Sequence, residues 1–188
     1  MRTRAWAPAR RKKETAILNF MVLGGPRSAT TWAANWLTTD TTICLHDPLL
    51  EYRIEMLQRL TFPGKRLGIS CTSAMLYPDW VNAQGCPKVV LHRPVKDINR
   101  SLRELGLVEL IPAKHEARLA AVEDALHIPY EHLFTPTGGA AIAEHLGVPF
   151  DAARHNLLMQ IRCEPMWKRL NIGKEAANAL VKKILEAR

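Results

Sequence analysis

The stretch "ILNFMVLGGPRSATTW", residues 17–32, carries the main indication of the fold. Its first seven residues are apolar apart from Asn19 and predict a buried strand. Gly24 and Gly25 follow, and then a segment of helical character at 30–37. In an open parallel sheet the first turn from strand to helix is a common phosphate site, because ligands bind beyond the carboxyl ends of the strands. The sequence therefore predicts a phosphate-binding loop at 24–32.

The rest of the chain repeats this strand-then-helix pattern. Short apolar or β-branched runs predict buried strands at 17–23, 41–45, 66–70, 88–92 and 125–130. Helices are predicted between and after them, at 30–37, 48–60, 78–83, 96–105, 138–150, 150–161 and 173–186. This alternation predicts a three-layer α/β fold with a parallel central sheet and helices on both faces. We expect a basic N-terminal tail at 1–14 and a single domain at 15–188.

Composition narrows the classes of partner. A chain of 188 residues is long enough for one well-buried core, and its formal net charge of +8 favours anionic partners such as phosphate-bearing cofactors, nucleic acid or acidic glycans. The four cysteines form no C-x-x-C pair, which predicts reduced thiols, no bound metal and a cytoplasmic protein. No apolar run is long enough for a membrane span, and no export signal is predicted.

The predicted loop lacks the lysine of a nucleoside-triphosphate site. Against the pattern G-x-x-x-x-G-K-[ST], Gly24 and Ala29 take the glycine positions, Thr30 stands where lysine is required, and Thr31 is the hydroxyl residue. That lysine reaches the β and γ phosphates, so its absence predicts a ligand with one phosphate at this end and no need for a metal. Arg27 would lean over a group attached beyond that phosphate. A glycine-rich turn that is only a tight connection is the alternative.

The segment "PRSATTW" resembles the P-[KR]-S-G-T-T-W loop of the sulfotransferases, which use 3′-phosphoadenosine 5′-phosphosulfate (PAPS) and have a P-loop-like α/β fold. The resemblance implies that the loop holds the 5′-phosphosulfate and that Trp32 packs on the adenine; the alternative is that Trp32 and Trp36 face the core. Ala29 replaces the family's glycine, and a β-carbon there is tolerable if φ is negative. The implied cofactor residues in the loop are Gly25, Pro26, Arg27, Ser28, Ala29, Thr30, Thr31 and Trp32.

A second segment, "KVVLHRPVKDINRSL", is similar to the family's 3′-phosphate segment, in which a strand ends in arginine and a serine follows on the next helix. The corresponding residues here are Arg93 and Ser101, which together would bind the 3′-phosphate of PAPS or of its product, 3′-phosphoadenosine 5′-phosphate (PAP). "IPYEHL" is similar to a late stretch of the family and is expected to be a structural junction. The segment "WKRLNIGK" either closes the 3′-phosphate site or is a solvated basic face.

Transfer of a sulfuryl group needs a base near the acceptor and positive charge near the transferring group. Arg27 is the predicted cation. The predicted base is His46 or Asp47, which follow the second strand; Asp47 would otherwise orient His46 or cap a helix beginning near Pro48. His92 is a rival base, although strand alternation turns it away from Arg93.

The sequence therefore predicts a PAPS-dependent sulfotransferase acting on a hydroxyl or amine of a small-molecule or glycan acceptor, with Thr72 and Ser73 lining the acceptor pocket. A P-loop-like kinase or nucleotide-binding protein, a basic nucleic-acid-binding module and a non-catalytic family member are the alternatives. No nucleic-acid partner is expected, because the chain has no aromatic-rich basic strand and no helix-turn-helix pattern.

Overall fold

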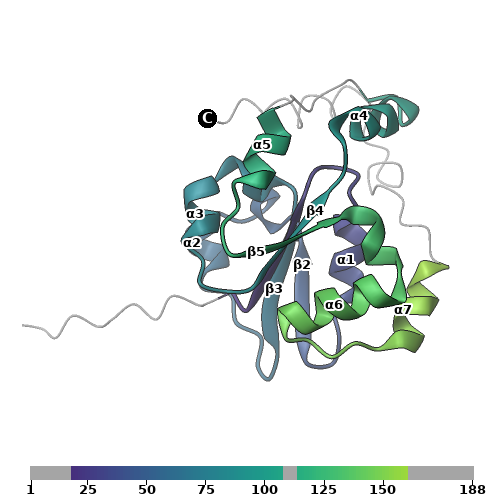
Figure 1. Cartoon of the computed structure of the whole chain (residues 1–188). Helices are drawn as coiled ribbons and strands as arrows, with labels where there is room; N and C mark the ends of the chain where they lie inside the picture. The colour runs from purple at the N-terminus through teal and green to yellow at the C-terminus, as the bar shows by residue number, and fades with distance from the viewer. Residues whose placement is uncertain (1–17, 108–113, 161–188) are drawn as a thin grey trace, which may run out of the picture.

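The computed structural model describes residues 18–107 and 114–160, and its centre is a five-stranded sheet in which every strand pair is parallel (Figure 1). The strand order is β2-β3-β1-β4-β5. The strands are β1 (Phe20–Gly24), β2 (Thr42–His46), β3 (Arg66–Cys71), β4 (Lys88–His92) and β5 (Ala125–Pro129). All five strands predicted from the sequence are therefore present, and β1 lies at the centre of the sheet.

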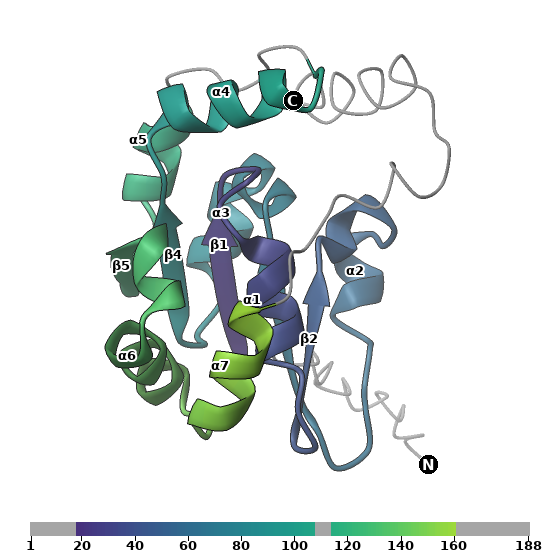
Figure 2. The same ribbon diagram turned by 90° about the vertical axis from the view of Figure 1, so that its right-hand side faces the viewer.

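Helices cover both faces of this sheet (Figure 1). One face carries α1 (Thr30–Trp36), α6 (Pro136–Leu146) and α7 (Ala152–Met159), and the other carries α2 (Ile54–Leu57), α3 (Pro78–Asn82) and α5 (Lys114–Ala120). Figure 2 shows α4 (Val95–Glu104) lying across the top, above the carboxyl ends of the strands. Single turns of 3-10 helix are η1 (Pro48–Leu50), η2 (Ser73–Leu76) and η3 (Tyr130–Phe134). The predicted three-layer α/β architecture is confirmed.

The structure differs from the predicted helices in two places. The single helix expected at 48–60 is broken into η1 and α2, because the chain at Arg53 is extended, with φ −70° and ψ 154°. Helix α5 has no counterpart in the prediction. The helix expected at 173–186, the tail at 1–14 and the basic segment "WKRLNIGK" lie outside the described residues.

The alternation of side chains along β1 builds a core on each face of the sheet. Phe20 and Val22 pack toward α1 and α6, whereas Met21 and Leu23 pack toward α2, α3 and α5, and all four are fully buried. The ring of Phe20 lies over Gly68 of β3, its register partner. A β-carbon at Gly68 would lie 2.0 Å from Phe20 Cε2, so only glycine fits beneath the ring.

The three cysteines within the described ranges, Cys44, Cys71 and Cys86, are free and buried, as the sequence predicts. Burial raises the pKa of Cys71 to about 12, which keeps it a neutral thiol. Across the described ranges, the structure contains no helix with the length and apolar character of a membrane span.

Helix α7 is fastened to the end of α1 by Arg154. Its guanidinium donates hydrogen bonds to the carbonyl oxygens of Asn35 (2.8 Å), Trp36 (3.4 Å) and Thr38 (2.6 Å). The last carbonyls of a helix have no partner inside the helix, so a cation there satisfies them and interacts favourably with the helix dipole. The Trp32 indole N–H, which donates to Leu158 O at 3.0 Å, adds a second link between α1 and α7.

We predict that Arg154→Ala lowers the free energy of unfolding by about 1–3 kcal/mol, because three charge-assisted hydrogen bonds to carbonyl oxygens at the end of α1 are lost. Urea denaturation followed by circular dichroism measures the change. The matched control is Arg59→Ala, which removes an exposed arginine and should change stability by less than about 0.5 kcal/mol. Equal effects of the two variants would contradict the role of Arg154.

Candidate functional site

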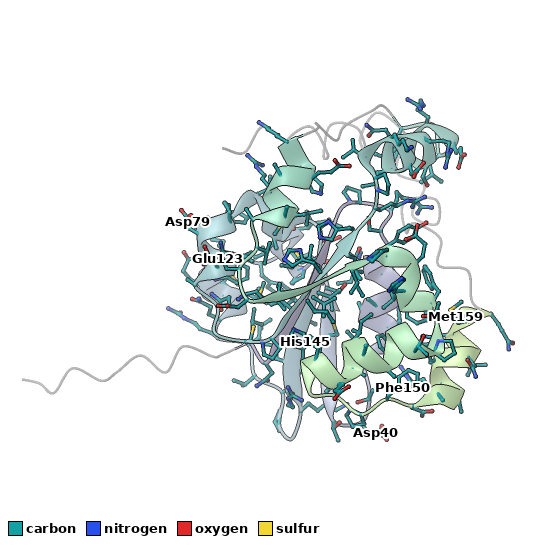
Figure 3. All side chains as sticks on the ribbon, in the orientation of Figure 1. Asp40, Asp79, Glu123, His145, Phe150 and Met159 are labelled. Carbon is teal, nitrogen blue, oxygen red and sulfur yellow. The ribbon has the colours of Figure 1, made fainter. Side chains whose placement is uncertain are left out.

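The residues singled out in the sequence gather at the carboxyl edge of the sheet, because parallel strands all end at the same side. The loop 25–29 leaves β1, His46 ends β2 and Asp47 follows it, and Arg93 follows β4. Ser101 lies on α4, the helix that crosses above this edge (Figure 2). His145, labelled in Figure 3, lies at the other end of the sheet, where its Nε2 is 2.9 Å from the carbonyl oxygen of Lys88 at the start of β4.

The loop between β1 and α1 has an unusual backbone. Arg27 and Ala29 both have φ +63°, the left-handed region, while the Ser28 N–H closes a turn to Gly25 O at 3.2 Å. Turns that contain left-handed residues make the concave arrays of backbone N–H groups that bind anions. The condition that we placed on Ala29, a negative φ, is not met. Alanine here holds a conformation that costs an L-residue roughly 1–2 kcal/mol.

The two predicted phosphate anchors touch each other. Arg27 Nε donates to Ser101 Oγ at 3.1 Å, although the two residues are 74 positions apart in the chain. Arg93 Nη1 donates to the carbonyl oxygen of Arg27. Loop, strand end and helix therefore form one unit. Ser28 Oγ and Arg93 Nε are buried and make no hydrogen bond to the described residues.

Tyr130 belongs to this unit, although the sequence reasoning gave it no chemical role. The guanidinium carbon of Arg93 lies 4.7 Å from the centre of the Tyr130 ring, within cation–π range. Tyr130 directly follows β5, so it lies at the carboxyl edge of the sheet. Its position at the end of a predicted strand is the feature of the sequence that could have identified it.

His46 and Asp47 form a second cluster beside the loop. His46 Nε2 lies 3.0 Å from Thr31 Oγ1, 3.4 Å from Thr30 Oγ1 and 3.2 Å from Asp47 Oδ2. The His46 side chain is 38% exposed, whereas that of Asp47 is 11% exposed. The imidazole therefore has polar partners on Nε2 and is the more accessible side chain of this cluster.

Asp47 does not cap the helix that follows it, which corrects one of our interpretations. It makes no side-chain capping bond to η1 and has φ +42°. Its Oδ1 instead accepts hydrogen bonds from the Thr72 N–H (2.5 Å), the Thr72 hydroxyl (2.8 Å) and the Ser73 N–H (3.4 Å). These bonds join the ends of β2 and β3 and fix the carboxylate against His46.

His92, the rival base, is engaged elsewhere. Its Nε2 lies 2.8 Å from His127 Nδ1, and His127 Nε2 lies 3.0 Å from Val122 O. Burial, followed by the nearby His127, lowers the pKa of His92. Its side chain and that of Arg93 have different partners, as strand alternation predicts.

His115, which no sequence pattern singled out, lies against the loop. A β-carbon at Gly25 would lie 3.1 Å from His115 Nε2 and 2.7 Å from Ile98 Cδ1, so the loop passes closely under α4 and α5. Burial, followed by the charge of Arg118, lowers the pKa of His115. A side chain at Gly25 would therefore displace the end of the Ile98 or His115 side chain.

Trp32 lies in the core and is only 5% exposed. Its ring packs against Trp36 at 5.6 Å and edge-on against Phe134 and His155, each at 5.3 Å between ring centres. Phe150, labelled in Figure 3 beside α6, extends this aromatic group through Trp36 at 6.2 Å. A contact between Trp32 and adenine stays a prediction, and it would involve only the small exposed part of the indole.

We predict that Ala29→Gly leaves the free energy of unfolding unchanged or raises it by up to about 1 kcal/mol. Relief of the left-handed strain stabilises the protein by about 1–2 kcal/mol. It offsets the loss of about 0.4–1 kcal/mol that arises because glycine gives the unfolded chain more conformational entropy. Ala117→Gly, on the exposed face of α5, is the control and should lower stability by about 0.5–1 kcal/mol. Urea denaturation compares them, and a larger loss at Ala29 than at Ala117 would contradict the strained backbone.

Comparison with known proteins supports the architecture. No family model matches the chain, and no curated protein matches its sequence. Among solved structures, the chain is similar to mouse sulfotransferase SULT7A1 complexed with PAP, with a TM-score of 0.52 and 15% sequence identity. The match covers 76% of this chain and 62% of the mouse chain, so this chain spans less than two thirds of that protein. The likeness shows that the parallel sheet and its two helical layers have the fold of a sulfotransferase.

Proposed function

We propose that this protein is a sulfotransferase that transfers a sulfuryl group from PAPS to a hydroxyl or amine of a small-molecule or glycan acceptor. The observation that carries the proposal is the hydrogen bond from Arg27 Nε to Ser101 Oγ, at 3.1 Å. It joins the segment that resembles a 5′-phosphosulfate loop to the segment that resembles a 3′-phosphate anchor. A ligand with phosphates at both ends would contact both segments.

The described residues fit such a ligand. Ser28 Oγ and Arg93 Nε are buried donors that lack a partner among the described residues, and an unsatisfied buried polar group costs roughly 1–3 kcal/mol. Phosphate oxygens are strong acceptors for both groups. We propose that residues 25–31 hold the 5′ end and that Arg93 and Ser101 hold the 3′-phosphate. When bound, PAPS supplies the activated sulfuryl group.

For the chemistry, we propose His46 as the general base and Asp47 as the group that orients it. A carboxylate only accepts, so the neutral imidazole carries its proton on Nε2, toward Asp47 Oδ2 at 3.2 Å. Nδ1 is then the nitrogen that takes the proton of the acceptor's hydroxyl or amine. Asp47 is an unsuitable base, because its Oδ1 already accepts bonds from Thr72 and Ser73. Arg27 would place positive charge beside the leaving 5′-phosphate oxygen.

We predict that the protein binds PAP without added metal and binds ATP with magnesium much more weakly, because Thr30 stands where a γ-phosphate lysine is required. Arg93→Ala should weaken PAP binding by about 1.5–3 kcal/mol, the scale of a lost charged hydrogen bond. Isothermal titration calorimetry measures both.

The control for that measurement is Arg100→Ala, which removes the same charge from an α4 arginine that is 64% exposed and paired with Asp97. It should leave PAP affinity nearly unchanged, because exposed pairs contribute little. ATP binding as tight as PAP binding would refute the proposed function, and it would favour a nucleotide-binding protein or kinase. Salt-dependent RNA or DNA binding in place of PAP binding would favour a nucleic-acid-binding module.

For the base, we predict that His46→Ala lowers turnover by about 10²- to 10⁴-fold while PAP affinity stays within about threefold. Asp47→Asn should lower turnover less than His46→Ala. Slow hydrolysis of PAPS to PAP, or a screen of phenols and sugars, provides the assay. His132→Ala, which removes an exposed histidine of η3, is the control. Full activity of both site variants would exclude His46 and Asp47 from the chemistry.

A further inference from the structure

Helix α4 begins with a cap that comes from another helix. The residue before it, Pro94, makes no side-chain capping bond. The N–H of Val95, the first residue of α4, instead donates to Glu116 Oε1 of α5 at 2.8 Å. Figure 2 shows α5 below the start of α4. A carboxylate at a helix N-terminus satisfies an otherwise unpaired N–H and interacts favourably with the helix dipole, so Glu116 holds the start of α4 in place.

The apolar contacts of α4 are separate from the two cores that flank the sheet. Within the described ranges they form a small cluster whose buried members are Ile98, Leu102 and Leu107. Segments that bury little apolar surface open at a lower free energy than the core of a protein does. Helix α4 can therefore move without opening either face of the sheet.

His115 lies beside Glu116 on α5 and faces the loop. Its Nε2 is buried near Gly25 and makes no hydrogen bond to the described residues. Ile98 of α4 approaches the same point of the loop and carries no charge. A protonated imidazole has an N–H on both nitrogens, so a charged His115 would bury an N–H without an acceptor. The ring therefore fits this place in its neutral form.

His92, at the end of β4, is held neutral by a different arrangement. The carbonyl oxygen of Val122 only accepts, so His127 Nε2 donates to it at 3.0 Å, and His127 Nδ1 is left as an acceptor. His92 Nε2 then donates to His127 Nδ1 at 2.8 Å, with the two ring centres 5.1 Å apart. A further proton on His127 Nδ1 would break this bond, and a charge on His92 would lie close to the second ring.

The charged groups around these rings act in opposite directions. Burial is the largest cause and lowers the pKa of both His92 and His115. His127 of β5 lowers the pKa of His92 further. Arg118 of α5 does the same for His115, whereas the Glu116 carboxylate raises the pKa of both rings. The net direction is downward, so the closed arrangement is favoured above the ordinary imidazole pKa of about 6.5 and loses stability as the pH falls below it.

We propose that His92, His115 and Glu116 form an acid-sensitive latch, which holds α4 over the sheet edge at neutral pH and releases it in mild acid. Helix α4 carries Ser101, whose Oγ accepts a hydrogen bond from Arg27 Nε, so release of α4 also frees the loop at the end of β1. The latch belongs to the protein without ligand, and this inference does not depend on the proposed function.

The experiment measures amide hydrogen exchange by mass spectrometry at about pH 7.5 and about pH 5.5, with rates corrected for intrinsic exchange. Protection in α4 should fall about 3- to 10-fold more than protection in β3, which reports opening of the whole sheet. Equal falls in α4 and β3 would indicate general acid unfolding and would overturn the inference. Unchanged protection of α4 would overturn it as well.

Variants assign the effect to these side chains. The double variant His92→Gln with His115→Gln keeps polar side chains but cannot titrate, so the changes in α4 and β3 should agree within about twofold. Glu116→Ala removes the acceptor of the Val95 N–H and should lower protection of α4 at both pH values. His132→Gln, which replaces an exposed histidine of η3, is the control and should keep the wild-type response to pH.

Two results with these variants would overturn the latch. One is a wild-type response to pH in the double variant, and the other is unchanged protection of α4 in Glu116→Ala. Should the double variant fail to fold, as judged by circular dichroism, the single variants His92→Gln and His115→Gln take its place. At least one of them must then reduce the fall in α4 by about twofold or more, and a full fall in both would overturn the inference. No ligand enters the experiment, so its failure would leave the proposed function untouched.

Discussion

The packing of Phe20 over Gly68 is the constraint on which the rest of the structure depends. It sets the register between β1 and β3, because a side chain at Gly68 would overlap the ring. The same glycine pairs with Cys44 of β2, so the register of β1, β3 and β2 is fixed and their carboxyl ends lie side by side. His46 then lies opposite Ser70, whose hydroxyl donates to Thr30 O at 2.8 Å in the first turn of α1. A shift of one residue would exchange the two faces of β1 and separate these groups.

The candidate site depends on contacts between distant segments more than on the loop sequence itself. Arg27 and Ala29 occupy a backbone region that L-residues avoid, and such conformations persist only where the surroundings impose them. Here Ser101 of α4 holds the Arg27 side chain, and Arg93 holds its carbonyl oxygen. Asp47 joins the ends of β2 and β3 in a similar way. The contacts at the sheet edge thus determine where the polar groups lie, and they also determine the backbone conformation of the loop.

The sequence predicts the buried parts of this fold well, because each strand is a short apolar run with clear limits. It predicts a continuous helix at 48–60 from the helical character of that segment. The bonds from Thr72 and Ser73 to Asp47 instead fix the start of the segment, and the chain is extended at Arg53. Helix α5 was missed because it buries a single apolar residue, Leu119, too few for a periodic signal. The left-handed conformation of Ala29 and the contact between Arg93 and the Tyr130 ring were not predicted, because both depend on neighbours that are remote in the chain.

The central place of β1 also has a consequence for the order in which the protein folds. Its partners are β3, which begins at Arg66, and β4, which begins at Lys88, so the first strand to leave the ribosome is completed only after most of the sheet has been made. Until then the apolar segment "FMVLG" has two open edges and two uncovered faces. Pairing over such long sequence distances is slow, and exposed strands of this kind associate with one another. During synthesis this segment therefore stays unpaired until β3 and β4 have been made, and the adjoining loop acquires its geometry late.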